Sequence, residues 1–110
     1  IDPSDADAWN SKGDSLNSLK KYDEAILAYE HAITIDPSDA DAWNSKGDSL
    51  NSLKKYDEAI LAYEHAITID PSDADAWNSK GDSLNSLGKG DEAKKCYDKA
   101  KELELASNEY

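Results

Sequence analysis

The chain is a tandem repeat of a single 34-residue sequence. Residues 1–34 recur without a difference as residues 35–68, and a third copy begins at Ile69 and stays identical through Leu87. A fixed period of this length is typical of repeat proteins, in which each copy folds into one small unit that stacks on its neighbours to bury its apolar face. The repeat therefore restricts the chain to an array of like units.

Each copy has the pattern of two amphipathic helices. In the first copy, Ser4 or Asp5 can cap a helix that follows Pro3 and covers about residues 6–19. A second helix is predicted over residues 22–34, where apolar residues recur at helical intervals. The break between the two helices is short, so they must pack antiparallel. The same signals predict helices over residues 40–53, 56–68 and 74–87.

A glycine lies inside the first predicted helix. Gly13 in a helix interior costs about 1 kcal/mol relative to Ala, so its position needs a compensation. We expect the compensation to be a close approach of the two helices, with Gly13 facing Ala25 and with Trp9 and Tyr29 on either side.

The central copy has tryptophan, glycine, leucine, alanine, tyrosine and proline at a fixed spacing, namely Trp43, Gly47, Leu50, Ala59, Tyr63, Ala66 and Pro71. With this spacing the copy resembles the tetratricopeptide repeat, a helix-turn-helix unit of the same length. The resemblance implies an all-α, right-handed solenoid of three stacked helix-turn-helix hairpins, six helices in all, in a single domain of residues 1–110. The repeats are expected at about residues 1–34, 35–68 and 69–110. The positions that depart from the family pattern are Lys12, Lys46 and Lys80, where Leu is usual, and Leu16, Leu50 and Leu84, where Tyr is usual.

The last helix of the third copy differs from its predecessors. Lysines at positions 94, 95 and 101 replace Ile26, Leu27 and Ile33 of the first copy, while the small and aromatic residues that face the hairpin are kept. This pattern predicts a polar capping helix. Gly88 and Gly90 are expected to loosen the turn before it, and residues 106–110 are expected to fray.

The first copy carries no polar change of this kind. Its amino-terminal face is therefore expected to expose apolar surface that an internal copy hides, and to self-associate or stack head to tail. Because Ile1 falls inside the turn between copies, the sequence indicates a fragment of a longer array or an engineered chain.

The charge balance restricts the partners. Asp and Glu outnumber Lys and Arg by 24 to 12, which gives a net charge of −12. Nucleic acid and anionic membranes need a basic surface, so both are excluded, whereas a cationic protein partner is allowed. The single Cys96 excludes an internal disulfide, and we expect a reducing, cytoplasmic location with no signal peptide and no membrane span.

The sequence lacks a constellation for catalysis or for a cofactor. Cys96 has lysine neighbours but no histidine one turn away, so a catalytic thiol is not expected. His31 and His65 stand beside glutamates without a second ligand at helical spacing, which indicates surface histidines rather than a metal site. The sequence therefore predicts no enzyme, no metal and no cofactor.

One polar stripe on the first helix of each copy is the candidate site. In the family that the chain resembles, these helices line a concave groove that contacts an extended peptide or a partner helix. The residues that match this stripe, and that we predict to bind a peptide, are Asp7, Asn10, Asp14, Asn17, Asp41, Asn44, Asp48, Asn51, Asp75, Asn78, Asp82 and Asn85. Carboxylates and amides suit a basic peptide and its backbone.

A second interpretation of the stripe remains open. The stripe can be a solvated face of a structural, engineered or recently amplified array that has no dedicated ligand. Identical copies favour this alternative, because a peptide is not periodic at the pitch of the array. Beside the stripe, Lys12, Lys46 and Lys80 are expected to lay their stems on the core and to place their ammonium groups in water or near an Asp.

Overall fold

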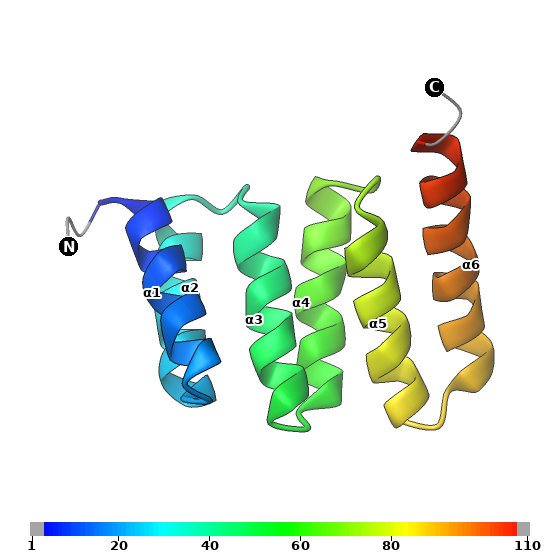
Figure 1. Cartoon of the computed structure of the whole chain (residues 1–110), viewed down its shortest axis with the longest axis horizontal. Coiled ribbons are helices and arrows are strands. Elements are labelled where there is room, and N and C mark those ends of the chain that lie inside the picture. The colour runs from blue at the N-terminus through cyan, green and yellow to red at the C-terminus, as the bar shows by residue number, and fades with distance from the viewer. Residues whose placement is uncertain (1–3, 108–110) are drawn as a thin grey trace.

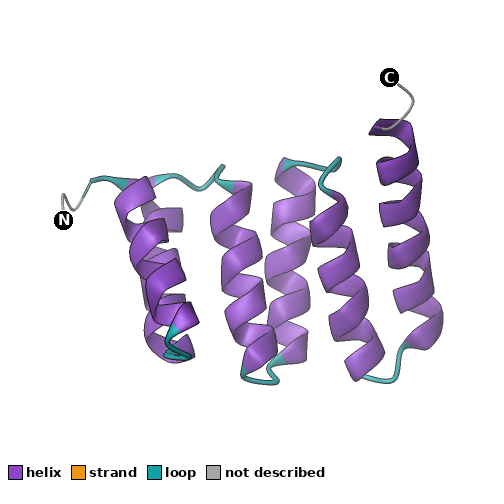
Figure 2. Cartoon of the chain, viewed as in Figure 1, coloured by secondary structure: helices purple, strands orange, loops and turns teal. Residues whose placement is uncertain are grey.

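The computed structural model describes residues 4–107, and every regular element within that range is an α-helix (Figure 2). The helices are α1 (Ala6–Ser18), α2 (Tyr22–Ile35), α3 (Ala40–Ser52), α4 (Tyr56–Ile69), α5 (Ala74–Ser86) and α6 (Gly90–Ser107). The six helices of the predicted all-α array are confirmed, and the first five have bounds within a residue of those expected. The tail prediction was wrong in part, because Ala106 and Ser107 belong to α6, while residues 108–110 lie outside the described range.

The helices begin and end at identifiable caps. Asp5, Asp39 and Asp73 cap α1, α3 and α5. Asp39 Oδ1, for example, accepts hydrogen bonds from the backbone N–H groups of Asp41 and Ala42 at 3.1 and 3.3 Å. These side chains satisfy N–H groups that the helix itself leaves unpaired.

The turn inside each hairpin has the same geometry in all three copies. Lys20 and Lys54 adopt positive φ angles of 61° and 62°, and Gly88 takes that place in the third copy with φ 79°. Lys21 and Lys89 each donate their N–H to a carbonyl of the preceding helix at 2.9 Å. Gly88 therefore does not loosen the turn. It occupies a left-handed position that costs a lysine about 1–2 kcal/mol and costs glycine little.

The array has an inner and an outer layer (Figure 1). We call α1, α3 and α5 the A helices, and α2, α4 and α6 the B helices. Within the described range α1 approaches α3 and α3 approaches α5, whereas α2 and α4 do not approach each other. The A helices therefore form the inner, concave layer and the B helices the outer one. The surface of α1, α3 and α5 that points away from the B helices is called the A-helix face below.

The core lies between the two layers. Tyr63 is 1% exposed, and it packs with the small residues Ala59 and Ala62 and with Leu50. A Cβ atom added at Gly47 would lie 2.6 Å from Cε1 of the Tyr63 ring. The glycine thus makes room for the tyrosine ring of its own hairpin. The expected Gly13–Ala25 approach was wrong in this respect, since the ring of Tyr29 occupies the space beside Gly13.

The last helix buries one face and exposes the other. Ala93, Cys96 and Ala100 are buried against the hairpin. Lys94 and Lys101 replace apolar residues of earlier copies, and both are exposed.

Candidate protein-binding face

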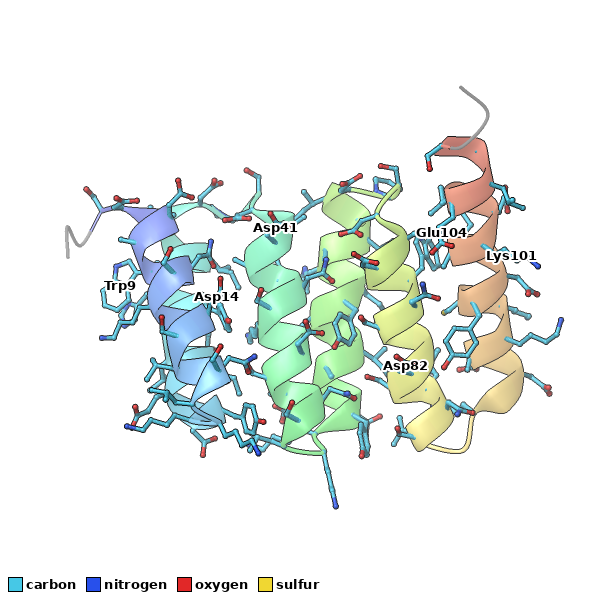
Figure 3. All side chains as sticks on the ribbon, in the orientation of Figure 1. Trp9, Asp14, Asp41, Asp82, Lys101 and Glu104 are labelled. Carbon is cyan, nitrogen blue, oxygen red and sulfur yellow. The ribbon has the colours of Figure 1, made fainter. Side chains whose placement is uncertain are left out.

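The aspartates in the middle of the A helices are bonded to the tyrosines of the B helices. Tyr29, Tyr63 and Tyr97 donate their hydroxyl protons to the carboxylates of Asp14, Asp48 and Asp82 at 2.7, 2.6 and 2.7 Å. Two of these aspartates, Asp14 and Asp82, lie on α1 and α5 in Figure 3. These three stripe residues therefore join the two helices of one hairpin. These tyrosine partners were not predicted from the sequence, although the constant fifteen-residue offset between aspartate and tyrosine in every copy was a usable signal.

The asparagines near the start of the A helices connect neighbouring repeats. Asn10 Nδ2 donates to Asp39 Oδ2 at 2.7 Å, and Asn44 Nδ2 donates to Asp73 at 2.9 Å. Each acceptor also caps the next A helix. The Oδ1 atoms of both asparagines are buried and have no hydrogen-bond partner among the described residues. These amides thus fix one repeat against the next.

A second row of polar bonds connects the A helices further along. Ser49 and Ser83 are fully buried, and their hydroxyl groups donate to Oδ1 of Asn17 and Asn51 at 2.8 and 2.9 Å. A buried hydroxyl without a partner would cost free energy, so each pair satisfies a requirement of the interface between repeats.

The twelve predicted residues therefore fall into two groups. The group that forms hydrogen bonds within the array comprises Asn10, Asp14, Asn17, Asn44, Asp48, Asn51 and Asp82. The group whose side chains form no hydrogen bond within residues 4–107 comprises Asp7, Asp41, Asp75, Asn78 and Asn85. Asp7, Asp41 and Asp75 occupy the first turn of each A helix and are exposed. Only the second group has its full hydrogen-bonding capacity open to a partner.

The hydrogen bonds and the burial shift the pKa values of the paired aspartate and tyrosine side chains. Although Asp48 is exposed at the surface, burial of its carboxyl beside Tyr63 raises the pKa of that group. The hydrogen bond from Tyr63 opposes this shift, and the Asp75 carboxylate adds to it. The hydrogen bond to Asp82 raises the pKa of Tyr97 to about 12. Burial, with the bond to Asp14, raises the pKa of Tyr29 as well. The phenols therefore remain protonated donors at neutral pH.

Replacing Asp48 with Asn or Ala tests this pair. Asp48→Asn keeps an acceptor for Tyr63, so we expect its free energy of unfolding at pH 7 to be within about 0.5 kcal/mol of wild type or higher. Asp48→Ala leaves the buried hydroxyl without that acceptor and should cost about 1–3 kcal/mol. Urea denaturation at pH 4 and pH 7 measures both. An equal loss in the two variants would show that Tyr63 does not need an acceptor at this position.

The difference in unfolding free energy between the wild type and Asp48→Asn should change with pH in a defined direction. The pKa of Asp48 is raised in the folded chain, so its stabilising contribution is fully present below about pH 4 and is lost as the pH rises through the folded value. The asparagine does not titrate. We therefore expect the stability difference to move in favour of Asp48→Asn between pH 4 and pH 7, and a constant difference would contradict the raised pKa.

The lysines beside the core also link neighbouring repeats. Lys46 and Lys80 pair with Glu30 and Glu64 of the preceding B helix, at 3.3 Å in each case. The ammonium of Lys46 also lies over the ring of Trp43, 5.3 Å from its centroid. The lysines thus pack beside the core as expected, but their partner is a glutamate or an indole and not an Asp.

The histidines are not isolated surface residues. His31 stacks on Trp9 and His65 stacks on Trp43, with ring centroids 4.4 and 4.1 Å apart. Within the described part of the chain, no cluster of three His, Cys, Asp or Glu side chains is arranged to hold a metal ion. No helix in the described range combines the length and the apolar character needed to cross a membrane.

Two cavities lie between neighbouring repeats and away from the stripe, whereas a further cavity at the start of α1 is lined in part by the stripe residue Asp7. One of about 340 Å³ is lined by α2, α3 and α4, and another of about 530 Å³ is lined by α4, α5 and α6 and the turn before α6. Both border the B helices. The A-helix face is therefore an open polar surface, which suits an extended or helical segment better than a small molecule.

Comparisons with known proteins agree with this architecture. Two family models, each described as tetratricopeptide repeat, match the chain, one at residues 6–39 and 40–73 and the other at residues 62–102. No curated protein matches the chain by sequence.

Solved structures provide closer comparisons. A crystal structure of MamA is 33% identical with a TM-score of 0.96; the match covers 99% of this chain and 64% of that one, so this chain spans slightly less than two thirds of it. A second MamA structure is 33% identical with a TM-score of 0.91, and the match covers 99% of this chain and 61% of that one. The second TPR of Spaghetti (RPAP3), bound to the HSP90 peptide SRMEEVD, is 28% identical with a TM-score of 0.86. The match covers 89% of this chain and 91% of that one.

Three observations point to the same family. The repeat is 34 residues long, each hairpin packs a tyrosine ring against a glycine, and the family models cover residues 6–102. The chain belongs to the tetratricopeptide repeat family.

Proposed function

We propose that the chain is a protein-interaction scaffold that holds a peptide or a partner helix on the A-helix face. The observation that carries the proposal is the set of exposed, uncommitted polar side chains on successive A helices, above all Asp7, Asp41 and Asp75. The solved TPR of RPAP3 with a bound HSP90 peptide supports a peptide as the kind of partner.

We propose further that the partner is basic. The peptide in the RPAP3 structure, SRMEEVD, carries three acidic residues and one arginine. The stripe of this chain has no cation, and the chain as a whole has a net charge of −12. A basic segment would be attracted by this field, and its backbone would find donors and acceptors in Asn78 and Asn85. The same field argues against nucleic acid and anionic membranes as partners, and we retain the cytoplasm as the proposed location.

A second candidate function has its own support. Seven stripe residues are engaged in hydrogen bonds of the array itself, which favours a structural array without a dedicated ligand. Such an array would self-associate through the surface of α1 and α2, where a cavity of about 330 Å³ is lined by Trp9, Leu16 and Leu27. Leu27 is 60% exposed there.

Fluorescence anisotropy with labelled peptides distinguishes the two functions. A lysine-rich and a glutamate-rich peptide of equal length are titrated with the chain at low and high salt. We expect the basic peptide alone to bind, and its affinity to fall with salt. Light scattering on the same samples reports self-association. Binding by neither peptide, together with a dimer or a filament, would favour the structural array.

Two charge-matched variants localise the binding. The first replaces Asp7, Asp41 and Asp75 with Asn on the A helices. The control replaces Asp23, Asp57 and Asp91 with Asn at the first turns of the B helices, which removes the same charge from the outer layer. Loss of binding in the first variant only supports the A-helix face. An equal loss in both would show a nonspecific effect of net charge.

A further inference from the structure

The same cavity between repeats occurs twice in the chain, and the two cavities differ in some of the side chains that line them. Each time it lies between a B helix and the hairpin that follows it. The positions that line it in both places are Ile26, Glu30, Trp43, Lys46, Leu50 and Glu58 in one, and Ile60, Glu64, Trp77, Lys80, Leu84 and Glu92 in the other. Because these side chains correspond one to one, the two cavities differ at their remaining lining positions. Some of these diverge in sequence in the third copy, such as Lys95, and others, such as Lys89, do not.

The main difference is an aromatic ring. His65 lines the first of these cavities and stacks on Trp43, with ring centroids 4.1 Å apart and planes 16° apart. The corresponding residue of α6 is Lys99, whose ammonium is 3.8 Å from Glu102 on the same helix. Among the described residues, Trp77 therefore has no ring stacked on it, and the second cavity measures about 530 Å³ against about 340 Å³ for the first. We call this larger space the α6 cavity.

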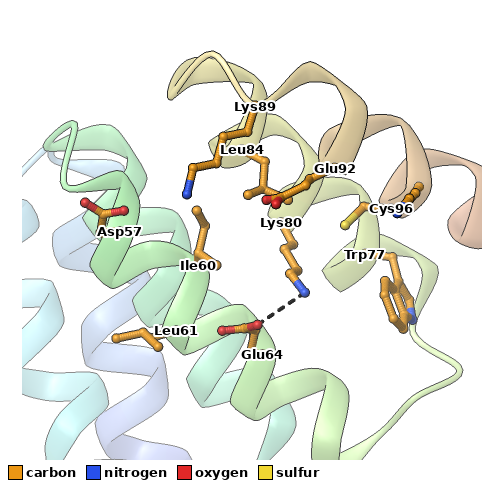
Figure 4. Close-up of a pocket in the computed structure, with 11 residues that line it drawn as sticks. Asp57, Ile60, Leu61, Glu64, Trp77, Lys80, Leu84, Lys89, Glu92 and Cys96 are labelled. Carbon is orange, nitrogen blue, oxygen red and sulfur yellow. Dashed lines mark ion pairs between the residues drawn. The ribbon is translucent and has the colours of Figure 1, made fainter.

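The α6 cavity is also more cationic than its counterpart. Lys95 lines it where Leu61 lines the earlier cavity, and Lys89 reaches it from the turn before α6. Neither lysine forms an ion pair within residues 4–107, whereas Lys80 is paired with Glu64, as Figure 4 shows. In a chain with a net charge of −12, two unpaired ammonium groups beside an apolar floor of Ile60 and Leu84 form a distinct local environment.

We propose that the α6 cavity binds a small planar aromatic molecule that carries an anionic substituent. Its ring would stack on Trp77 in the way that the imidazole of His65 stacks on Trp43. Its anionic group would pair with Lys95 or Lys89, while the carboxylates of Asp57 and Glu92 on the same rim disfavour a second negative charge. The volume is within the range of small-molecule sites in proteins.

The probe for this site is 2-naphthoate, followed by NMR through the indole N–H signals of the three tryptophans. We expect a saturable shift of the Trp77 signal, with a dissociation constant on the order of 1 mM, and much smaller shifts at Trp9 and Trp43. Comparable shifts at all three tryptophans, or no saturable shift at Trp77, would overturn the proposal.

Two reciprocal substitutions test the role of the missing ring. Lys99→His restores the residue of the first two copies, so it should fold normally and weaken naphthoate binding about tenfold. His65→Lys opens the equivalent space beside Trp43 and should produce a new shift of the Trp43 signal. Unchanged binding to the Lys99→His chain would show that the ring does not stack on Trp77.

Related probes test the two chemical requirements separately. Cyclohexanecarboxylate keeps the charge without a planar ring, and 2-naphthylmethylamine keeps the ring with the opposite charge. Both should bind more weakly than 2-naphthoate. Lys95→Leu, which restores the residue of the earlier copies, should remove much of the preference for the anion. Equal affinity of the cationic probe would contradict the anionic requirement. The proposal is independent of peptide binding, since the α6 cavity borders the B helices and not the stripe.

Discussion

Replacing Tyr63 with Ala is expected to lower the free energy of unfolding by about 3–5 kcal/mol, the range measured for large aromatic truncations in cores. Tyr63 is 1% exposed in the middle of the array. Its ring fills the space that Gly47 leaves free, and its hydroxyl donates to Asp48. Truncation would therefore leave a cavity between the helices of the hairpin and remove the bond that ties α4 to α3.

The matched control is Tyr63→Phe. This change keeps the ring and removes only the hydroxyl, and Asp48 can turn to solvent, so a loss of about 0.5–1.5 kcal/mol is expected. Urea denaturation followed by helical circular dichroism measures both variants. If the alanine variant lost no more stability than the phenylalanine variant, the ring would not be the main stabilising contact of the hairpin.

The expected cost is large relative to the whole protein. A chain of three repeats is near the lower limit for a stable array, and each repeat is stabilised mainly by its neighbours. Damage to the central hairpin weakens α2·α3 and α4·α5 contacts together. We therefore expect the urea transition of Tyr63→Ala to be less cooperative than that of the wild type, because the outer hairpins would then unfold separately.

The helices could be predicted from the sequence because their signals are local. The aspartate caps, the apolar spacing and the short turns lie within one copy, and the five helices with predicted ranges appear within a residue of them. The sequence also predicts that Trp9 and Tyr29 fill the space between the two helices of a hairpin, and Trp43 and Tyr63 are the same positions in the central copy. Tyr63 is buried, and Trp43 packs against the buried cluster around it while keeping some exposure.

The function of the stripe could not be predicted in the same way. Asn10 and Asp7 lie on the same side of one helix, yet Asn10 reaches the cap of the next A helix and Asp7 forms no hydrogen bond in the described range. The difference depends on how closely two repeats stack, which no single helix specifies. Likewise, whether Gly13 faces Ala25 or Tyr29 depends on the direction of a side chain. The contacts between copies, and the side-chain directions within one copy, therefore could not be read from the repeat sequence alone.

Identity of the copies explains why so much of the stripe is structural. Every bond between repeats needs one partner from each copy, so a unit that stacks on itself must carry both partners at once. Asn44 with Asp73 and Ser49 with Asn17 are such pairs. This constraint leaves few stripe positions free for a ligand, and within residues 4–107 those few are the exposed aspartates of the first turns together with Asn78 and Asn85 of the last A helix.

Replacing Trp43 with Ala is the second large perturbation, and we expect it to cost about 3 kcal/mol, at the lower end of the range for this truncation. Trp43 is only partly buried, but it packs against the cluster around Tyr63, as does Ile26 of the preceding repeat. Its Nε1 donates to the carbonyl of Pro37 at 3.2 Å. Its loss would also remove the ring on which His65 stacks.

Trp9→Ala is the internal comparison, measured by the same urea denaturation on the same 110-residue chain. Trp9 stacks on His31 as Trp43 stacks on His65, but within residues 4–107 no helix precedes it as α2 precedes Trp43. If packing between repeats supplies much of the stability, Trp9→Ala should cost clearly less than Trp43→Ala. Equal losses would instead assign the tryptophan's contribution to its own hairpin, and the array would then be held together mainly by the hydrogen bonds of the A helices.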